Sequence, residues 1–136
     1  MMLVDTSIFV PIFRDLSGQR RQRFRKYLRG RSFVLSRFTQ LELLRGCSSE
    51  PQWEELSDYL DSQDYVEAKG ETWAAASRVH FDLKRKGLSV ESIYDCCIAQ
   101  IAIENRLTLV HNDKDFETIV KVRPLQQNRF DIQARD

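Results

Sequence analysis

The sequence predicts an α/β fold: a three-layer α/β/α sandwich with a mainly parallel central sheet. Short apolar segments of strand length alternate along the chain with longer segments in which apolar residues recur at helical spacing. The run LTLV at residues 107–110 is one such short, mainly apolar segment, as expected for a strand in a sheet that is covered on both faces. Strands and helices that alternate in this way favour a parallel sheet covered by helices on both sides.

Seven helices and five strands are expected. The strands are predicted at residues 1–4, 32–35, 65–66, 107–110 and 122–125. The helices are predicted at residues 7–14, 16–29, 36–45, 51–60, 70–85, 89–105 and 113–120. Apolar residues recur most clearly in the helix at 89–105. Helical spacing also places Trp53, Trp73 and Phe81 among the expected core residues.

Length and composition indicate one globular domain over residues 1–136. The chain has 42% hydrophobic and 30% charged residues, and its polar end predicts a weakly ordered tail from about residue 126. No apolar run approaches the roughly 20 residues of a membrane helix, and the N-terminus has no signal-peptide pattern. The cysteines, Cys47, Cys96 and Cys97, make a poor disulfide framework and indicate reduced thiols in the cytoplasm.

The net charge of +1 conceals a strong asymmetry along the chain. Residues 14–31 carry eight arginines and lysines against Asp15, whereas residues 50–71 carry eight acidic residues against Lys69. The basic segment could follow a phosphate backbone or could simply form a solvated helix face, and both interpretations remain open. The acidic segment is interpreted as a solvated face.

Carboxylates follow the predicted strands. Asp5 ends the first strand, Glu42 lies in the helix after the second, and Asp113 and Asp115 follow residues 107–110. In parallel sheets, ligands bind beyond the carboxyl ends of the strands. The positions of these acidic residues therefore predict that they converge at one edge of the sheet.

Asp95 lies near the start of the helix that leads into residues 107–110, among apolar and small helical neighbours. A lone carboxylate there would be costly to remove from water, and a hard cation shared with other carboxylates would offset that cost. Each acidic residue also has a structural interpretation. Asp5 could cap a helix, and the dipoles of their helices favour Asp95, Asp113 and Asp115. The joint placement of the residues favours a shared site.

Four segments of the chain resemble the signature segments of PIN domains, in particular the VapC-type toxins of bacterial toxin–antitoxin pairs. The four segments occur in family order and span nearly the whole chain. They are LVDTSIF at Asp5, TQLELLRG at Glu42, YDCCIAQIA at Asp95 and LVHNDKDFETI at Asp113.

The resemblance implies a PIN-like, Rossmann-like fold and an endoribonuclease that depends on Mg²⁺ or Mn²⁺. The catalytic residues that it implies are Asp5, Glu42, Asp95 and Asp113. The metal ligands that it implies are Asp5, Asp95 and Asp113, with Asp115 and Glu42 as further candidates. Candidate substrate-binding residues are Thr6, Ser7 and Asn112. His111 stands where many members have threonine, and contact with RNA and packing at a strand end both remain open for it.

The partners that the resemblance implies are an RNA substrate, a VapB-like antitoxin protein and a second copy of the chain in a homodimer, with no membrane. Two alternatives were weighed. A non-catalytic PIN-like interaction module would require broken acidic positions, and here they are intact. Another acidic-pocket phosphotransfer protein would need a second aspartate two residues after Asp5, or one after residues 65–66, where this chain has Ser7 and Glu67.

Overall fold

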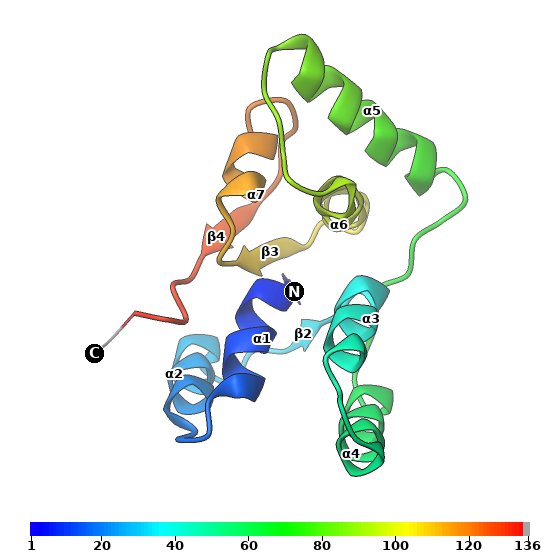
Figure 1. The fold of residues 1–136 in the computed structure, drawn as a ribbon. Helices are drawn as coiled ribbons and strands as arrows, with labels where there is room; N and C mark the ends of the chain where they lie inside the picture. Colours follow the sequence, from blue (N-terminus) through cyan, green and yellow to red (C-terminus); the bar gives the residue numbers. More distant parts are fainter. Residues whose placement is uncertain (135–136) are drawn as a thin grey trace.

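Four parallel strands form the central sheet of the computed structural model, which describes residues 1–134 (Figure 1). The strands are β1 Met2–Val4, β2 Phe33–Val34, β3 Thr108–His111 and β4 Gln127–Arg129. Their order is β2-β1-β3-β4, and every neighbouring pair is parallel. The predicted α/β fold with a parallel sheet is therefore confirmed.

The helices are α1 Thr6–Arg14, α2 Gln19–Leu28, α3 Arg37–Arg45, α4 Glu50–Asp61, α5 Thr72–Arg85, α6 Ile93–Glu104 and α7 Lys114–Ile119. Their positions agree with the predicted ones to within a few residues. None of these helices combines the length and the apolar character that crossing a membrane requires.

Alternating residues of the strands pack into two cores on opposite sides of the sheet. Leu3 and Leu109 join the buried residues of α5, α6 and α7. Val4 and Val110 join those of α1 and α2 instead. All four side chains have no exposed surface, and full burial of each stabilises the fold by roughly 1.5–3 kcal/mol. Burial on both faces explains why these strands read as continuous apolar runs.

The last strand lies later in the chain than predicted. Residues 122–125 do not form it, and the part expected to be a weakly ordered tail from about residue 126 contains β4 and a fully buried Ile132. β4 is a polar edge strand held by backbone pairing to β3, so hydropathy alone does not reveal it. The strand expected at residues 65–66 is reduced to one parallel bridge between Leu35 and Tyr65.

Three aromatic residues predicted in the core are exposed. The exposed fractions are 47% for Trp53, 53% for Trp73 and 45% for Phe81. Helical spacing shows which residues share a face, but it does not show whether another element covers that face. The prediction for the cysteines agrees with the structure, because all three are free thiols and Cys96 and Cys97 are buried.

Candidate active site

The carboxyl ends of β1 and β3 lie side by side and bring four predicted catalytic residues into one pocket. Asp5 directly follows β1 and caps α1, and Asp113 follows β3 and caps α7. Asp95 lies in the first turn of α6, and Glu42 lies on α3. The pocket, called here the acidic pocket, has a volume of about 260 Å³ and is lined by Asp5, Thr6, Ser7, Val10, Glu42, Glu91, Ser92, Asp95, Ile98 and Asp113.

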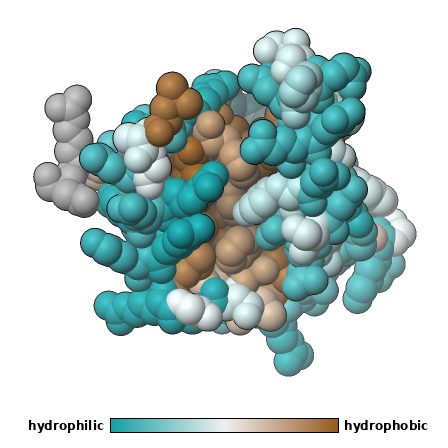
Figure 2. Space-filling view, turned by 90° about the horizontal axis from the view of Figure 1, so that it is seen from below, coloured by the Kyte–Doolittle hydropathy of each residue, from teal (hydrophilic) through white to brown (hydrophobic). Residues whose placement is uncertain are grey.

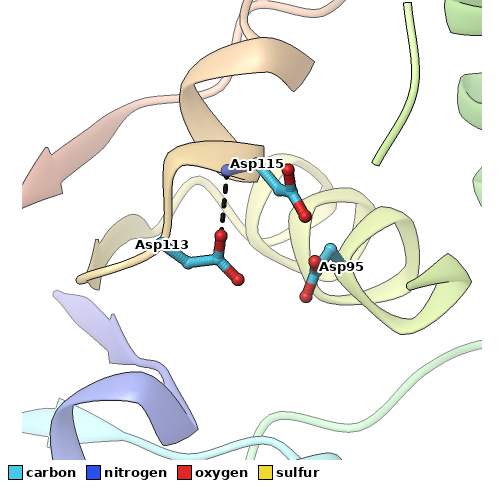
Figure 3. A group of neighbouring side chains, drawn as sticks. All are labelled: Asp95, Asp113 and Asp115. Atoms are coloured by element: carbon cyan, nitrogen blue, oxygen red, sulfur yellow. Dashed lines mark hydrogen bonds between the residues drawn. The ribbon is translucent and has the colours of Figure 1, made fainter. Parts of the chain in front are cut away.

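Three aspartates, called here the carboxylate trio, are placed to share one ion. Asp95, Asp113 and Asp115 each offer a carboxylate oxygen, and these oxygens lie within 4.8 Å of one another. Figure 3 shows Asp113 and Asp115 at the start of α7, facing Asp95 on α6. Asp113 accepts a hydrogen bond of 3.0 Å from the backbone N–H of Asp115, and Asp115 accepts one of 2.9 Å from the backbone N–H of Glu91. These bonds hold two of the carboxylates in place.

The chemistry of the trio fits a hard divalent cation. All three ligand groups are carboxylates, the donors that Mg²⁺ and Mn²⁺ prefer, and no sulfur or imidazole belongs to the group. Asp115 is 7% exposed, although it makes no salt bridge to a described residue. A buried carboxylate beside two others is costly unless positive charge accompanies it. The residues present therefore fit the predicted metal.

Burial raises the pKa of Asp95 to about 8, and the nearby charges of Asp113, Asp5, Asp115 and Glu42 add to the shift. Burial also raises the pKa of Asp5, which is 6% exposed, against the opposing hydrogen bonds from Ser7. The pKa of Glu42 is raised by burial and then by the charge of Asp5. The uncompensated carboxylates therefore favour protonation, and a bound cation would reverse that preference.

Ser7 links the ends of β1 and β3. Its hydroxyl donates a hydrogen bond of 2.7 Å to Oδ2 of Asp5 and accepts one of 2.8 Å from the backbone N–H of Asn112. Its own backbone N–H donates to the same carboxylate oxygen at 3.0 Å. The hydroxyl thus fixes Asp5 and satisfies a backbone donor beside Asp113.

Removing this hydroxyl should destabilise the protein. In Ser7→Ala, the N–H of Asn112 and the buried carboxylate of Asp5 each lose a partner, so we expect the free energy of unfolding to fall by about 1–3 kcal/mol. Urea denaturation measures this change. The matched control is Ser17→Ala, because the hydroxyl of Ser17 makes its bonds on the exposed surface. An equal loss in the two variants would contradict a linking role for Ser7.

The other two candidate substrate-binding residues are engaged elsewhere through their side chains. The hydroxyl of Thr6 pairs with that of Thr39 at 3.0 Å in a buried contact, which joins α1 to α3. The side-chain oxygen of Asn112 accepts a bond of 3.2 Å from Arg129, so Asn112 contacts the pocket region through its backbone N–H. Their role in substrate binding stays a prediction that these contacts do not favour.

His111 is fully buried at the end of β3. Its Nδ1 accepts a hydrogen bond of 3.1 Å from the backbone N–H of Asp113, and its Nε2 lies 2.6 Å from the side-chain oxygen of Gln127. Because Nδ1 acts as an acceptor, Nε2 carries the proton in neutral histidine and donates to Gln127. Of the two interpretations left open by the sequence, the contacts favour packing at a strand end.

Sequence reasoning missed three residues at the site. Glu91 and Ser92 line the acidic pocket, and Thr39 supports Thr6. Ser92 caps α6 by accepting a hydrogen bond of 3.1 Å from the N–H of Tyr94. A serine before the apolar pattern of α6 is a readable capping signal, and Thr39 begins the segment TQLELLRG that resembles a PIN-domain signature, whereas nothing in the sequence marks Glu91.

Comparison with known proteins identifies the family. The profile described as "PIN domain" matches residues 2–122. The chain belongs to the PIN domain family. Two curated PIN-domain relatives are each 30% identical over 135 residues, covering 96% of this chain and 99% of theirs. They are VapC ribonuclease Mb1587 of Mycobacterium bovis and Ribonuclease VapC11 of Mycobacterium tuberculosis.

Solved structures share the PIN-domain fold. FitAcB from Neisseria gonorrhoeae is 18% identical with a TM-score of 0.72, covering 97% of this chain and 98% of that one. VapBC2 from Rickettsia felis, bound to a DNA fragment from its promoter, is 20% identical with a TM-score of 0.71, covering 96% and 98%. At 18–20% sequence identity, this structural similarity establishes the fold only.

Proposed function

We propose that this PIN domain is a cytoplasmic endoribonuclease that depends on Mg²⁺ or Mn²⁺ and is the toxin of a VapBC-type toxin–antitoxin pair. The observation that carries the proposal is that Asp5, Glu42, Asp95 and Asp113 line one pocket, where Asp95 and Asp113 also form the carboxylate trio with Asp115. The curated relatives named as VapC ribonucleases support RNA as the substrate. A non-catalytic module is disfavoured because every predicted acidic position is intact.

The proposed mechanism assigns a role to each carboxylate. Asp95 and Asp113 would hold the cation together with Asp115. Asp5, also predicted as a ligand, lines the same pocket. When bound, such an ion neutralises phosphate charge and lowers the pKa of a coordinated water for attack on the phosphodiester. Ser7 keeps Asp5 oriented through its hydrogen bond of 2.7 Å.

Proton movement follows from the shifted pKa values. Burial and nearby carboxylates raise the pKa of Asp95 to about 8, so Asp95 would hold a proton near neutral pH and would have to release it in order to bind a cation. Glu42 also lines the pocket, and its pKa, raised by burial and then by the charge of Asp5, would suit it to accept a proton from the attacking water. Cleavage would leave a 5′ phosphate and a 3′ hydroxyl, as the family resemblance implies.

The antitoxin partner is proposed from the toxin–antitoxin complexes among the similar structures. Figure 2 shows a strip of hydrophobic side chains between hydrophilic flanks on the face that contains α2 and α4. A groove on this face is lined by residues that include Val10, Phe13, Glu42 and Leu56. Val10 and Glu42 also line the acidic pocket, so the groove is continuous with that pocket. We propose this groove as the surface that the antitoxin covers. The predicted homodimer stays a prediction.

The test is cleavage of a panel of RNAs by the purified protein. We expect cleavage with Mg²⁺ or Mn²⁺, none with EDTA, and none by Asp5→Asn. Asp58→Asn, an exposed aspartate on α4, is the matched control and should retain full activity. Expression of the wild type, but not of Asp5→Asn, should stop bacterial growth unless the antitoxin is present. Cleavage that survives EDTA would contradict the metal dependence, and harmless expression of an active enzyme would contradict the toxin role.

A further inference from the structure

A second pocket, of opposite charge, lies where the C-terminal end of α5 meets the segment after α7. It has a volume of about 380 Å³ and is called here the basic pocket; its lining residues are Arg78, Asp82, Arg85, Lys86, Lys121, Val122 and Arg123. Five cationic side chains thus surround one carboxylate. None of these residues belongs to the acidic pocket or to the basic segment at residues 14–31.

The guanidinium groups of the basic pocket are held in place before any ligand arrives. Asp82 accepts a hydrogen bond of 3.1 Å from Arg78 through one oxygen and one of 2.8 Å from Arg123 through the other. The ring of Phe81 lies beneath Arg78 at 4.8 Å and beneath Arg85 at 5.8 Å. Guanidinium groups fixed in this way retain outward N–H donors, which suit phosphate oxygens.

Two lysines of the basic pocket carry positive charge that no described acidic residue pairs with in a salt bridge. Lys86 and Lys121 are exposed and make no salt bridge to a described residue. The positive charge of these two lysines is therefore available to a ligand of the basic pocket.

Two short stretches of chain join the basic pocket to the acidic one. Helix α7 begins beside Asp113 and ends at Ile119, two residues before Lys121, and its six residues span about 9 Å along the helix axis. The segment between α5 and α6 leads from Lys86 to Glu91, whose N–H bonds to Asp115, and Figure 1 shows it passing beside α7. A strand of RNA with one phosphate in the acidic pocket can therefore reach the basic pocket within a few nucleotides.

An acidic pocket repels the substrate that the proposed function gives it. Asp5, Glu42, Asp95 and Asp113 line this pocket, and the negative potential of these carboxylates opposes an approaching phosphodiester. Affinity for RNA must then come from cations outside the site, since phosphate contacts dominate nucleic-acid binding. Cations near helix C-termini also have a structural explanation through the helix dipole, and the experiment below separates the two roles.

We propose that the basic pocket binds backbone phosphates of the RNA strand whose scissile bond lies in the acidic pocket. The proposal rests on the proposed ribonuclease function, and it makes Lys86 and Lys121 substrate-positioning residues rather than catalytic ones. Because the contacts are to phosphates, they hold RNA of any sequence.

The test compares Lys86→Gln/Lys121→Gln with wild type. Binding of a fluorescent single-stranded RNA is measured in EDTA by anisotropy over a range of salt concentrations. We expect binding about tenfold weaker, and a slope of log affinity against log salt smaller by about 1.4, because a single-strand phosphate contact contributes about 0.7. In Mn²⁺ the KM should rise and kcat should stay the same. The melting temperature should not change.

The matched control is Lys69→Gln/Arg106→Gln, which removes the same charge at two exposed positions outside both the basic pocket and the basic segment 14–31. An equal loss of affinity in the control would overturn the proposal, as would wild-type affinity and salt slope in the Lys86/Lys121 variant. A lower melting temperature with unchanged affinity would establish a structural role instead and would also overturn it. If the wild-type protein binds RNA in EDTA but never cleaves it, the ribonuclease function is refuted. The binding comparison still decides whether the basic pocket holds RNA phosphates.

Discussion

Asparagine at position 95 is expected to reduce RNA cleavage by roughly a thousandfold while leaving the protein folded. Asp95 is the one member of the carboxylate trio on α6, so its loss separates that helix from the proposed ion. The remaining members of the trio, Asp113 and Asp115, both lie at the start of α7 and cannot replace it. Single-turnover cleavage of a labelled RNA in saturating Mn²⁺ measures the effect, with Asp58→Asn as the control.

The metal dependence of the variant provides a second readout. Asp95→Asn should need a higher Mn²⁺ concentration for half-maximal activity, because it lacks a charged ligand. A kcat within threefold of wild type at the same Mn²⁺ concentration would remove Asp95 from the catalytic set. Full activity with no shift in metal dependence would remove it from the metal site as well.

The metal-free protein should be most stable in mild acid and should lose stability as the pH rises towards 8. In the folded state burial and neighbouring carboxylates raise the pKa of Asp95 to about 8, whereas its ordinary value is 3.8. Between these values the folded state holds a proton that the unfolded state has released, so its stability falls with increasing pH. The raised pKa values of Asp5 and Glu42 act in the same direction. With partial contact to water allowed for, we expect a loss on the order of 3 kcal/mol.

Thermal melts in EDTA between pH 5 and pH 8 measure this loss. Asp95→Asn should flatten the pH profile and melt above wild type at pH 8, because it removes one like charge. Mn²⁺ at about 100 times its dissociation constant should stabilise wild type by roughly 2.7 kcal/mol, and it should stabilise the variant less. A wild-type profile that rises from pH 5 to pH 8, or an equal metal response in the two proteins, would rule out a shared carboxylate site.

The sheet and most of the acidic pocket were predictable because their signals are local. Strands such as β3 are buried on both faces and therefore read as apolar runs. Asp5 and Asp113 directly follow such runs, and the parallel topology brings the ends of those runs together. The resemblance to PIN domains placed Glu42 and Asp95 beside them.

The remaining features depend on contacts between distant segments. β4 pairs through its backbone and presents polar side chains, so neither its position nor the bond from His111 to Gln127 has a signal in hydropathy. The exposure of Trp73 and Phe81 depends on what packs over α5, which periodicity does not report. The basic pocket joins residues from α5 with residues after α7, and their proximity is set by the fold alone.

The order of the strands in the sheet has a consequence for how the protein matures during synthesis. Ser7 and Asn112, whose hydrogen bond joins the ends of β1 and β3, are 105 positions apart in the chain. Residues 7–112 must therefore be synthesised before Asp5 and Asp113 can come together. Residue 127 must be synthesised before His111 can form its hydrogen bond to Gln127. Long-range pairing of this kind is slow to form. A nascent chain that ends before residue 112 therefore lacks the assembled acidic pocket.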